Sequence, residues 1–209
     1  MVRVKVCGIT NRGDALAAIE AGADALGFNF YLGSPRYIEP EEAERIVAEL
    51  PPFVTPVGVF VNESRQVMKS LAARCDLRTV QLHGDELPAA VAALAPLAVI
   101  KAFAVGRRWR PQLLKNYKDC AAFLLDTGVK GKRGGTGKRF DWQQARRAKA
   151  YGRLILAGGL TPENIEDAIA AVKPYGVDVC TGVERHPGKK DLRRLRNFIQ
   201  RARAAAAAL

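Results

Sequence analysis

The chain has 209 residues, of which 48% are hydrophobic, and its formal net charge at pH 7 is +12; this length allows one large domain or two small ones. No apolar stretch is long enough to span a membrane and no signal peptide is recognisable, so we expect a cytoplasmic protein without a membrane partner. The four cysteines are too widely spaced for a zinc site or a CxxC redox motif, and we expect reduced thiols at Cys7, Cys75, Cys120 and Cys180.

Short apolar runs and amphipathic segments alternate along the whole chain. The apolar runs predict eight strands, in chain order at residues 2–6, 25–28, 55–61, 79–82, 97–102, 121–125, 153–156 and 176–179. The segments between them predict eight helices, which begin near Asn11, after Pro40, at Asn62 or Glu63, at Asp85, near Arg110, near Asp141, at Thr161 and near Lys190. This order predicts an α/β fold, a (β/α)8 TIM barrel formed by a single domain over residues 1–209, with an open doubly wound sheet as the alternative.

Three of the predicted strands end in a group that can transfer a proton. The carboxyl ends of parallel strands form the catalytic rim of a barrel, and there the sequence has Cys7, His83 and Asp126. Cys7 and Asp126 suit a general base that faces a general acid. A buried structural cysteine is the alternative for Cys7, and a structural hydrogen bond is the alternative for His83.

Glycine-rich turns follow the seventh and eighth predicted strands, at Ala157-Gly158-Gly159 and at Cys180-Thr181-Gly182. Glycines let backbone N–H groups approach an anion, and the helix amino ends that follow add positive potential. Barrels often bind phosphate at this pair of loops. We therefore predict a phosphate site there, with ordinary tight turns as the alternative.

Positive charge gathers in two places, a glycine-rich loop at 127–139 and the C-terminal segment 185–203. This charge favours an anionic partner, and a nucleic-acid-binding protein is the alternative of a different class. The loop lacks the interleaved aromatic residues of a single-strand platform, so we do not expect nucleic acid as the partner. Arg36, in the loop after the second strand, can pair with a carboxylate or a phosphate, unless it is an ordinary surface arginine.

A set of short motifs, at least one for almost every strand and helix pair, resembles the phosphoribosylanthranilate isomerase family of tryptophan biosynthesis. Each motif alone is weak, but their order along the whole chain is specific. The matching stretches are Lys5 to Thr10, Gly22 to Phe28, Ser34 to Tyr37, Gly58 to Asn62, Val80 to Glu86, Leu125 to Thr127, Gly134 to Gly137, Ala157 to Leu160, Gly182 to Glu184 and Pro187 to Asp191.

This resemblance implies an Amadori rearrangement, an aldose–ketose isomerisation that needs neither a metal nor an organic cofactor. It implies that Asp126 protonates the ring oxygen of the phosphorylated substrate and that Cys7 removes the C2′ proton. It further implies that Arg36 pairs with the anthranilate carboxylate. For His83 we predict a contact with the substrate from its place at the strand end, and the structural hydrogen bond stays the alternative. The phosphate is expected on the backbones of Gly158, Gly159, Thr181 and Gly182. The family usually has serines where this chain has Cys180 and Thr181, so a serine contact at position 180 is absent.

Another phosphate-binding barrel enzyme, such as an indole-glycerol-phosphate synthase or a sugar-phosphate epimerase, is the second enzymatic alternative. Such enzymes typically need a Lys/Glu set or metal-binding His and Asp at the strand ends, and the predicted rim does not have these sets. Exposed helix faces and helix faces buried in a dimer look alike in a sequence. Both a monomer and a homodimer therefore remain open.

Overall fold

The computed structural model of the protein describes residues 1–106, 109–127 and 142–209. The predicted glycine-rich loop lies outside the described residues from Gly128 onward, together with its five basic residues and the predicted helix start at Asp141. Within the described part of the chain, every helix is too short or too polar to cross a bilayer.

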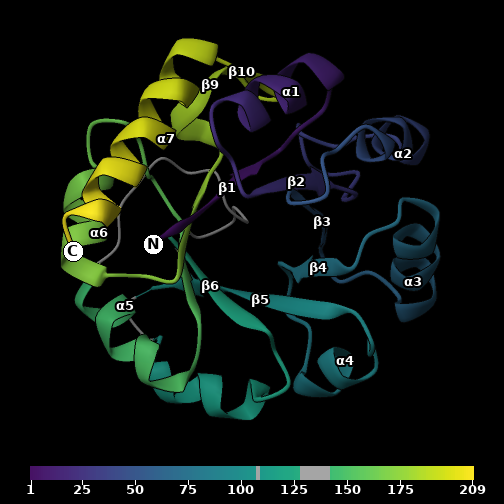
Figure 1. The fold of residues 1–209 in the computed structure, drawn as a ribbon. Helices are drawn as coiled ribbons and strands as arrows, with labels where there is room; N and C mark the ends of the chain where they lie inside the picture. Colours follow the sequence, from purple (N-terminus) through teal and green to yellow (C-terminus); the bar gives the residue numbers. More distant parts are fainter. Residues whose placement is uncertain (107–108, 128–141) are drawn as a thin grey trace.

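Eight parallel strands close into a barrel in chain order, and helices surround it (Figure 1). The first strand pairs with the second on one side and with the eighth on the other, which closes the sheet. The strands are β1 (Arg3–Cys7), β2 (Ala25–Asn29), β3 (Thr55–Phe60), β4 (Thr79–Leu82), β5 (Ala98–Val105), β6 (Ala122–Thr127), β7 (Leu154–Leu156) and β8 (Gly176–Val179). The predicted (β/α)8 barrel is confirmed, and the open sheet is excluded.

The outer ring consists of seven α-helices and two short 3₁₀ segments within the described residues. They are α1 (Arg12–Glu20), α2 (Pro40–Ala48), α3 (Arg65–Arg74), α4 (Pro88–Ala92), η1 (Pro111–Tyr117), α5 (Trp142–Ala148), η2 (Lys149–Tyr151), α6 (Ile165–Val172) and α7 (Leu192–Ala207). The weak helix predicted near Arg110 is the 3₁₀ segment η1. α7 lies between α6 and α1 and completes the ring where the barrel closes (Figure 1).

Alternation along the strands separates two apolar cores. In β1, Val4 and Val6 belong to the large core between the strands and the helices. Because successive side chains of a strand point to opposite faces, Lys5 and Cys7 point into the barrel. The inner core is small and is formed by Val57, Ile100, Ala102, Ala122, Leu124, Ile155 and Ala157. The barrel interior is therefore packed below the catalytic rim, as in other barrels of this type.

The helix predicted at Asp85 begins three residues later, at Pro88. The reason is the carboxylate of Glu86, which is buried and accepts a hydrogen bond from the backbone N–H of Asn62 at 2.8 Å. It also forms a buried ion pair with Lys101 at 3.1 Å. A side chain that we expected to favour a helix amino end instead holds two loops of the rim together.

The helix predicted at Thr161 also begins later, at Ile165. Thr161 forms a turn of its own, in which its hydroxyl accepts a hydrogen bond from the N–H of Glu163 at 3.2 Å. Asn164 accepts from the N–H of Thr161 at 3.0 Å and donates to the carbonyl of Gly159 at 2.8 Å. Local side-chain bonds of this kind compete with the helix, and here they fix the loop after β7.

A short hairpin that the sequence did not predict follows β8. It consists of the turn η3 (Thr181–Val183), β9 (Glu184–His186) and β10 (Lys189–Lys190). The closing helix α7 begins at Leu192, two residues after the predicted start near Lys190. Its N-cap is Asp191, which accepts the first free N–H groups of the helix.

Candidate active site

All of the predicted site residues lie at the carboxyl ends of the strands. Cys7 ends β1, Asp126 lies in β6, and His83 directly follows β4. The Arg36 loop follows β2, the glycine pair at 158–159 follows β7, and η3 follows β8. Because the eight strands are parallel and closed, these segments share one face of the barrel.

A cavity of about 460 Å³ opens on this face between the ends of β6, β7 and β8. It joins Asp126 with all four residues of the predicted phosphate site, and the further lining residues include Asp178, Glu184 and Arg194. Among the described residues, Cys7, Arg36 and His83 are not part of the lining, but each lies against it. Cys7 lies near Lys5, which pairs with the lining residue Asp178. Arg36 pairs with the lining residue Glu184. His83 lies beside the lining residue Asp126.

The two glycine-rich loops pack against each other around the cavity. Gly158 and Gly159 have φ angles of +82° and +67°, which L side chains rarely adopt. A Cβ at Gly158 would lie 2.5 Å from the backbone nitrogen of Thr127, and one at Gly182 would overlap the carbonyl oxygen of Leu160. Glycine is thus required at both positions by conformation or by space, beyond the turn preference that the sequence suggested.

Arg194 is a cation in the lining that the sequence analysis counted only within the basic C-terminal segment 185–203. Its guanidinium Nε donates to the carbonyl of Gly182 at 3.0 Å, and Nη2 pairs with Glu163 at 3.1 Å. It comes from the first turn of α7, close to the capping residue Asp191. The available signal was the helix predicted near Lys190. The hairpin between β8 and this helix was not predicted, so the place of Arg194 at the cavity was missed.

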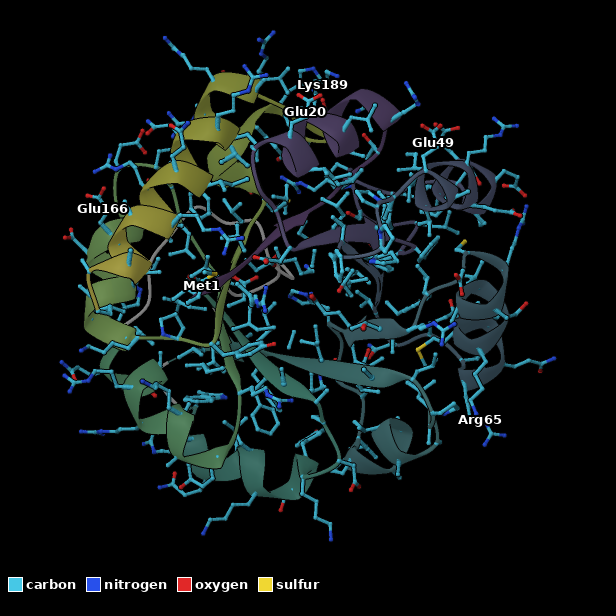
Figure 2. All side chains as sticks on the ribbon, viewed as in Figure 1. Met1, Glu20, Glu49, Arg65, Glu166 and Lys189 are labelled. Atoms are coloured by element: carbon cyan, nitrogen blue, oxygen red, sulfur yellow. The ribbon has the colours of Figure 1, made fainter. Side chains whose placement is uncertain are left out.

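The remaining C-terminal basic residues are largely paired with acids around the outside of the barrel. Arg201 contacts Glu166 at 2.8 Å, and Arg203 contacts Asp24 at 2.7 Å. Glu166 lies on the outer helices in Figure 2. Neighbouring acids therefore offset part of the charge that motivated a nucleic-acid partner, and the basic loop itself lies outside the described residues.

Asp126 is almost fully buried, with 6% of its surface exposed. Its Oδ1 accepts a hydrogen bond from the N–H of Thr127 at 2.7 Å, and its Oδ2 lies 3.6 Å from Nε2 of His83. The other ring nitrogen of His83, Nδ1, lies 2.9 Å from the amide nitrogen of Gln81. A neutral His83 that accepts this amide proton carries its own proton on Nε2, toward Asp126. The carboxyl group is thereby oriented on both sides.

Cys7 is a free thiol, half-buried at the end of β1. Burial raises the pKa of this thiol, Lys5 and Lys190 lower it, and Asp178 raises it further; the net direction is upward. The ammonium of Lys190 also donates to the carbonyl oxygen of Cys7 at 2.6 Å, which fixes the end of the strand. The thiol is therefore held in place, and its protonation depends on the charges around it.

Arg36 is held by a carboxylate of the protein itself. Its Nε lies 3.0 Å and its Nη2 2.7 Å from the carboxylate of Glu184, and Nη2 also reaches the hydroxyl of Thr181 at 3.2 Å. Burial would lower the pKa of the guanidinium, but the hydrogen bonds and charge of Glu184 raise it. Among the described residues nothing hydrogen-bonds Nη1, which leaves that nitrogen to donate to a further acceptor.

Glu184 is the centre of this part of the site. Its side chain is only 2% exposed and also pairs with Lys190, a fully buried lysine, at 2.9 Å. The thiol of Cys180 lies 3.6 Å away, and burial raises the pKa of that thiol to about 12. The sequence analysis quoted Glu184 only as part of a motif. Two cations that share one buried carboxylate are a tertiary feature that the sequence pattern does not contain.

No group of three or more His, Cys, Asp or Glu side chains is placed to hold a metal ion within residues 1–106, 109–127 and 142–209. The predicted site residues thus contribute the Cys7 thiol, the Asp126 carboxyl group, the imidazole of His83, the guanidinium of Arg36 and glycine-rich backbone, and the structure adds Arg194. This set can exchange protons and bind anions.

Comparison with known proteins gives one consistent family. The family model for N-(5'-phosphoribosyl)anthranilate (PRA) isomerase matches residues 4–201. The N-(5'-phosphoribosyl)anthranilate isomerase of Geobacter metallireducens is 53% identical and covers 98% of this chain and 100% of its own length.

Two solved structures extend this likeness to three dimensions. A phosphoribosyl anthranilate isomerase in complex with reduced 1-(o-carboxyphenylamino)-1-deoxyribulose 5-phosphate has a TM-score of 0.88 and 46% identity, covering 98% of this chain and 100% of that one. Monomers generated from the dimeric isomerase of Thermotoga maritima have the same TM-score, 44% identity and the same coverage.

Proposed function

Because the chain belongs to the N-(5'-phosphoribosyl)anthranilate isomerase family and is an isomerase, we propose that it converts N-(5-phosphoribosyl)anthranilate to 1-(2-carboxyphenylamino)-1-deoxyribulose 5-phosphate in tryptophan biosynthesis. Asp126 is the general acid and Cys7 is the general base. One observation supports this assignment most: Asp126 shares a single cavity with the two glycine-rich loops, at the rim where Cys7 ends β1.

The reaction follows from these groups in two proton transfers. Protonated Asp126 donates its proton to the furanose ring oxygen, the C1′–O bond breaks, and a Schiff base forms between C1′ and the anthranilate nitrogen. The thiolate of Cys7 then removes the proton from C2′, and the electron pair moves into a C1′=C2′ double bond as the imine nitrogen regains its lone pair. Tautomerisation of this enol gives the ketone. No electron is gained or lost overall, and no cofactor is needed.

The substrate's two anionic groups match the two ends of the site. The phosphate fits the loops at 158–159 and 181–182, where Arg194 adds a positive charge. The anthranilate carboxylate fits Arg36, because Glu184 fixes the guanidinium and Nη1 has no hydrogen-bond partner among the described residues. The bound compound of the solved relative carries the same two groups in its name. His83 serves mainly to orient Asp126.

The phosphate assignment predicts a large effect of Gly182→Ala. The added methyl group would overlap the carbonyl of Leu160 and push the two loops apart. We expect the inhibition constant of inorganic phosphate and the KM to rise about tenfold, equivalent to about 1.4 kcal/mol of lost binding. Gly106→Ala is the matched control on the same face, because no atom of the described residues lies within 4 Å of its Cβ position. A folded Gly182→Ala protein with unchanged phosphate inhibition would contradict the assignment.

Growth of a bacterial strain that lacks this isomerase tests the function in cells. Expression of the chain is expected to restore growth on medium without tryptophan, and the double variant Cys7→Ala/Asp126→Asn is expected not to. Growth with the double variant would show that the rescue does not depend on the proposed acid and base.

We further propose that the chain acts as one catalytic domain over residues 1–209 and that it forms a homodimer in the cytoplasm. The T. maritima relative is described as dimeric, and the four cysteines here are free thiols, as expected in a reducing compartment. Sedimentation velocity is expected to give about twice the mass of the 22.7 kDa chain. A sedimenting species of single-chain mass at micromolar concentration would exclude a stable dimer.

A further inference from the structure

A buried ion pair lies inside the barrel directly below Cys7. Lys5 and Asp178 are register partners on β1 and β8, and the Lys5 ammonium lies 2.9 Å from the Asp178 carboxylate. Their side chains are 5% and 9% exposed. Placing two charges here is costly unless each is compensated, and small apolar side chains would fill the space at this level of the barrel. The proposed reaction gives this pair no task.

The ammonium of Lys5 also lies close to the sulfur of Cys7. The two residues are two positions apart on β1 and point to the same side. A Cβ at Gly27, on the neighbouring strand, would lie 2.8 Å from the sulfur and 3.0 Å from the ammonium nitrogen. The absence of a side chain at Gly27 therefore leaves room for both groups, and the positive charge of the ammonium favours the thiolate form of Cys7.

Other charged groups act on Cys7 from further elements. Lys190 of β10 binds its carbonyl oxygen, and Arg36 and the thiol of Cys180 interact with it electrostatically from the loops after β2 and β8. Arg36 and Lys190 are both engaged by Glu184. Lys5 is the cation that shares the interior face of β1 with the sulfur, and Asp178 is its counter-ion.

We propose that Lys5 is the positioning residue that stabilises the thiolate of Cys7, and that Asp178 limits this effect by sharing the same ammonium. This proposal rests on the role of Cys7 as the general base. The Cys7 thiol gives its proton to water, and the nearby ammonium of Lys5 then stabilises the negative charge of the thiolate. No bond other than S–H breaks, and no oxidant or reductant is required.

The pair makes two predictions of opposite sign. Lys5→Met removes the cation, so the pKa of Cys7 should rise by about one unit or more, which is about tenfold less thiolate at neutral pH. Asp178→Asn leaves the ammonium with the thiolate as its sole buried anionic partner on these two strands, so the pKa of Cys7 should fall. A residue that merely supports the fold would not shift the pKa in opposite directions in the two variants.

The measurement is the rate of Cys7 alkylation by iodoacetamide between pH 6 and about 11, followed by mass spectrometry after trypsin digestion. Digestion places Cys7 and Cys180 on separate peptides, so the rate of each thiol is read independently. Lys101→Met is the matched control, because Lys101 forms another buried lysine–carboxylate pair, with Glu86 at 3.1 Å. It should leave the Cys7 profile unchanged.

The proposal is overturned if the pKa of Cys7 stays the same or falls in Lys5→Met, or if it rises in Asp178→Asn. If one variant does not fold, as judged by circular dichroism, the direction of the pKa change of Cys7 in the other variant still tests the proposal. The assay does not depend on turnover, so it also separates the two claims. The pKa of Cys7 can shift in the expected directions while a Cys7→Ala enzyme remains active. That pair of results would contradict the catalytic assignment of Cys7 and leave the Lys5 inference intact.

Discussion

Cys7→Ala and Asp126→Asn are each expected to lower kcat by about 10²–10⁴-fold, the usual contribution of a positioned general acid or base. Alanine has no group that can remove the C2′ proton, and the amide of asparagine cannot protonate the ring oxygen. Substrate binding should survive, because the glycine-rich loops and Arg194 are untouched. The measurement is steady-state turnover, with binding followed separately by product inhibition.

Matched controls exist for both substitutions. Cys120 is another half-buried free thiol, but it precedes β6 and so lies toward the opposite end of the barrel from the site. Asp119 beside it is exposed. Cys120→Ala and Asp119→Asn are expected to keep normal turnover. Turnover near the wild-type value in Cys7→Ala or in Asp126→Asn would remove that residue from the mechanism.

Glu184→Ala is expected to have the largest effect on stability. The substitution leaves the partly buried Arg36 and the fully buried Lys190 without their shared carboxylate. Breaking a buried pair in this way typically costs about 3–5 kcal/mol, and here two pairs are broken. We expect the free energy of unfolding in urea to fall by at least that amount, and Arg36 to lose the position in which it can meet a carboxylate.

The same carboxylate makes a pH-dependent contribution to stability. Burial raises the pKa of Glu184, but the hydrogen bond from Arg36 and the charge of Lys190 lower it, and the net direction is downward. A lowered pKa in the folded state stabilises the fold above the unfolded value of about 4.3, and this contribution is lost as the pH falls below it. The difference in stability between wild type and Glu184→Ala should therefore shrink in acid.

Glu166→Ala is the control for this prediction. Glu166 pairs with Arg201 on the outside of the barrel, where water screens the charges. Its loss should leave the urea midpoint nearly unchanged. If the two variants unfold alike, the network around Glu184 does not stabilise the fold.

The strands of the barrel could be predicted because burial on both faces leaves an apolar run in the sequence. The predicted ranges for β4 and β8 agree with the structure. Helix starts were less predictable. Glu86 and Thr161 carry ordinary helix-start signals, but Glu86 binds the backbone of the loop after β3 and Thr161 forms a local turn with Glu163. The contact of Glu86 joins segments far apart in the sequence, which a local pattern does not show.

The candidate site was likewise predictable only in part. From strand-end positions and glycine turns, the sequence predicted that Asp126 and the predicted phosphate loops share one face of the barrel, and in the structure they line one cavity. The charges that act on Cys7 could not be found in this way, because Lys5 and Asp178 read as isolated polar residues in otherwise apolar strands. They become informative only when closure of the barrel brings β1 beside β8.

The fluorescence of freshly generated N-(5-phosphoribosyl)anthranilate gives the most direct test of the reaction and of its acid and base together. With purified protein at neutral pH, the fluorescence is expected to decay much faster than in the uncatalysed sample. Cys7→Ala and Asp126→Asn should return it to within a small fraction of the wild-type rate, while Cys120→Ala should not. Decay at the uncatalysed rate with folded wild-type protein would contradict the proposed function.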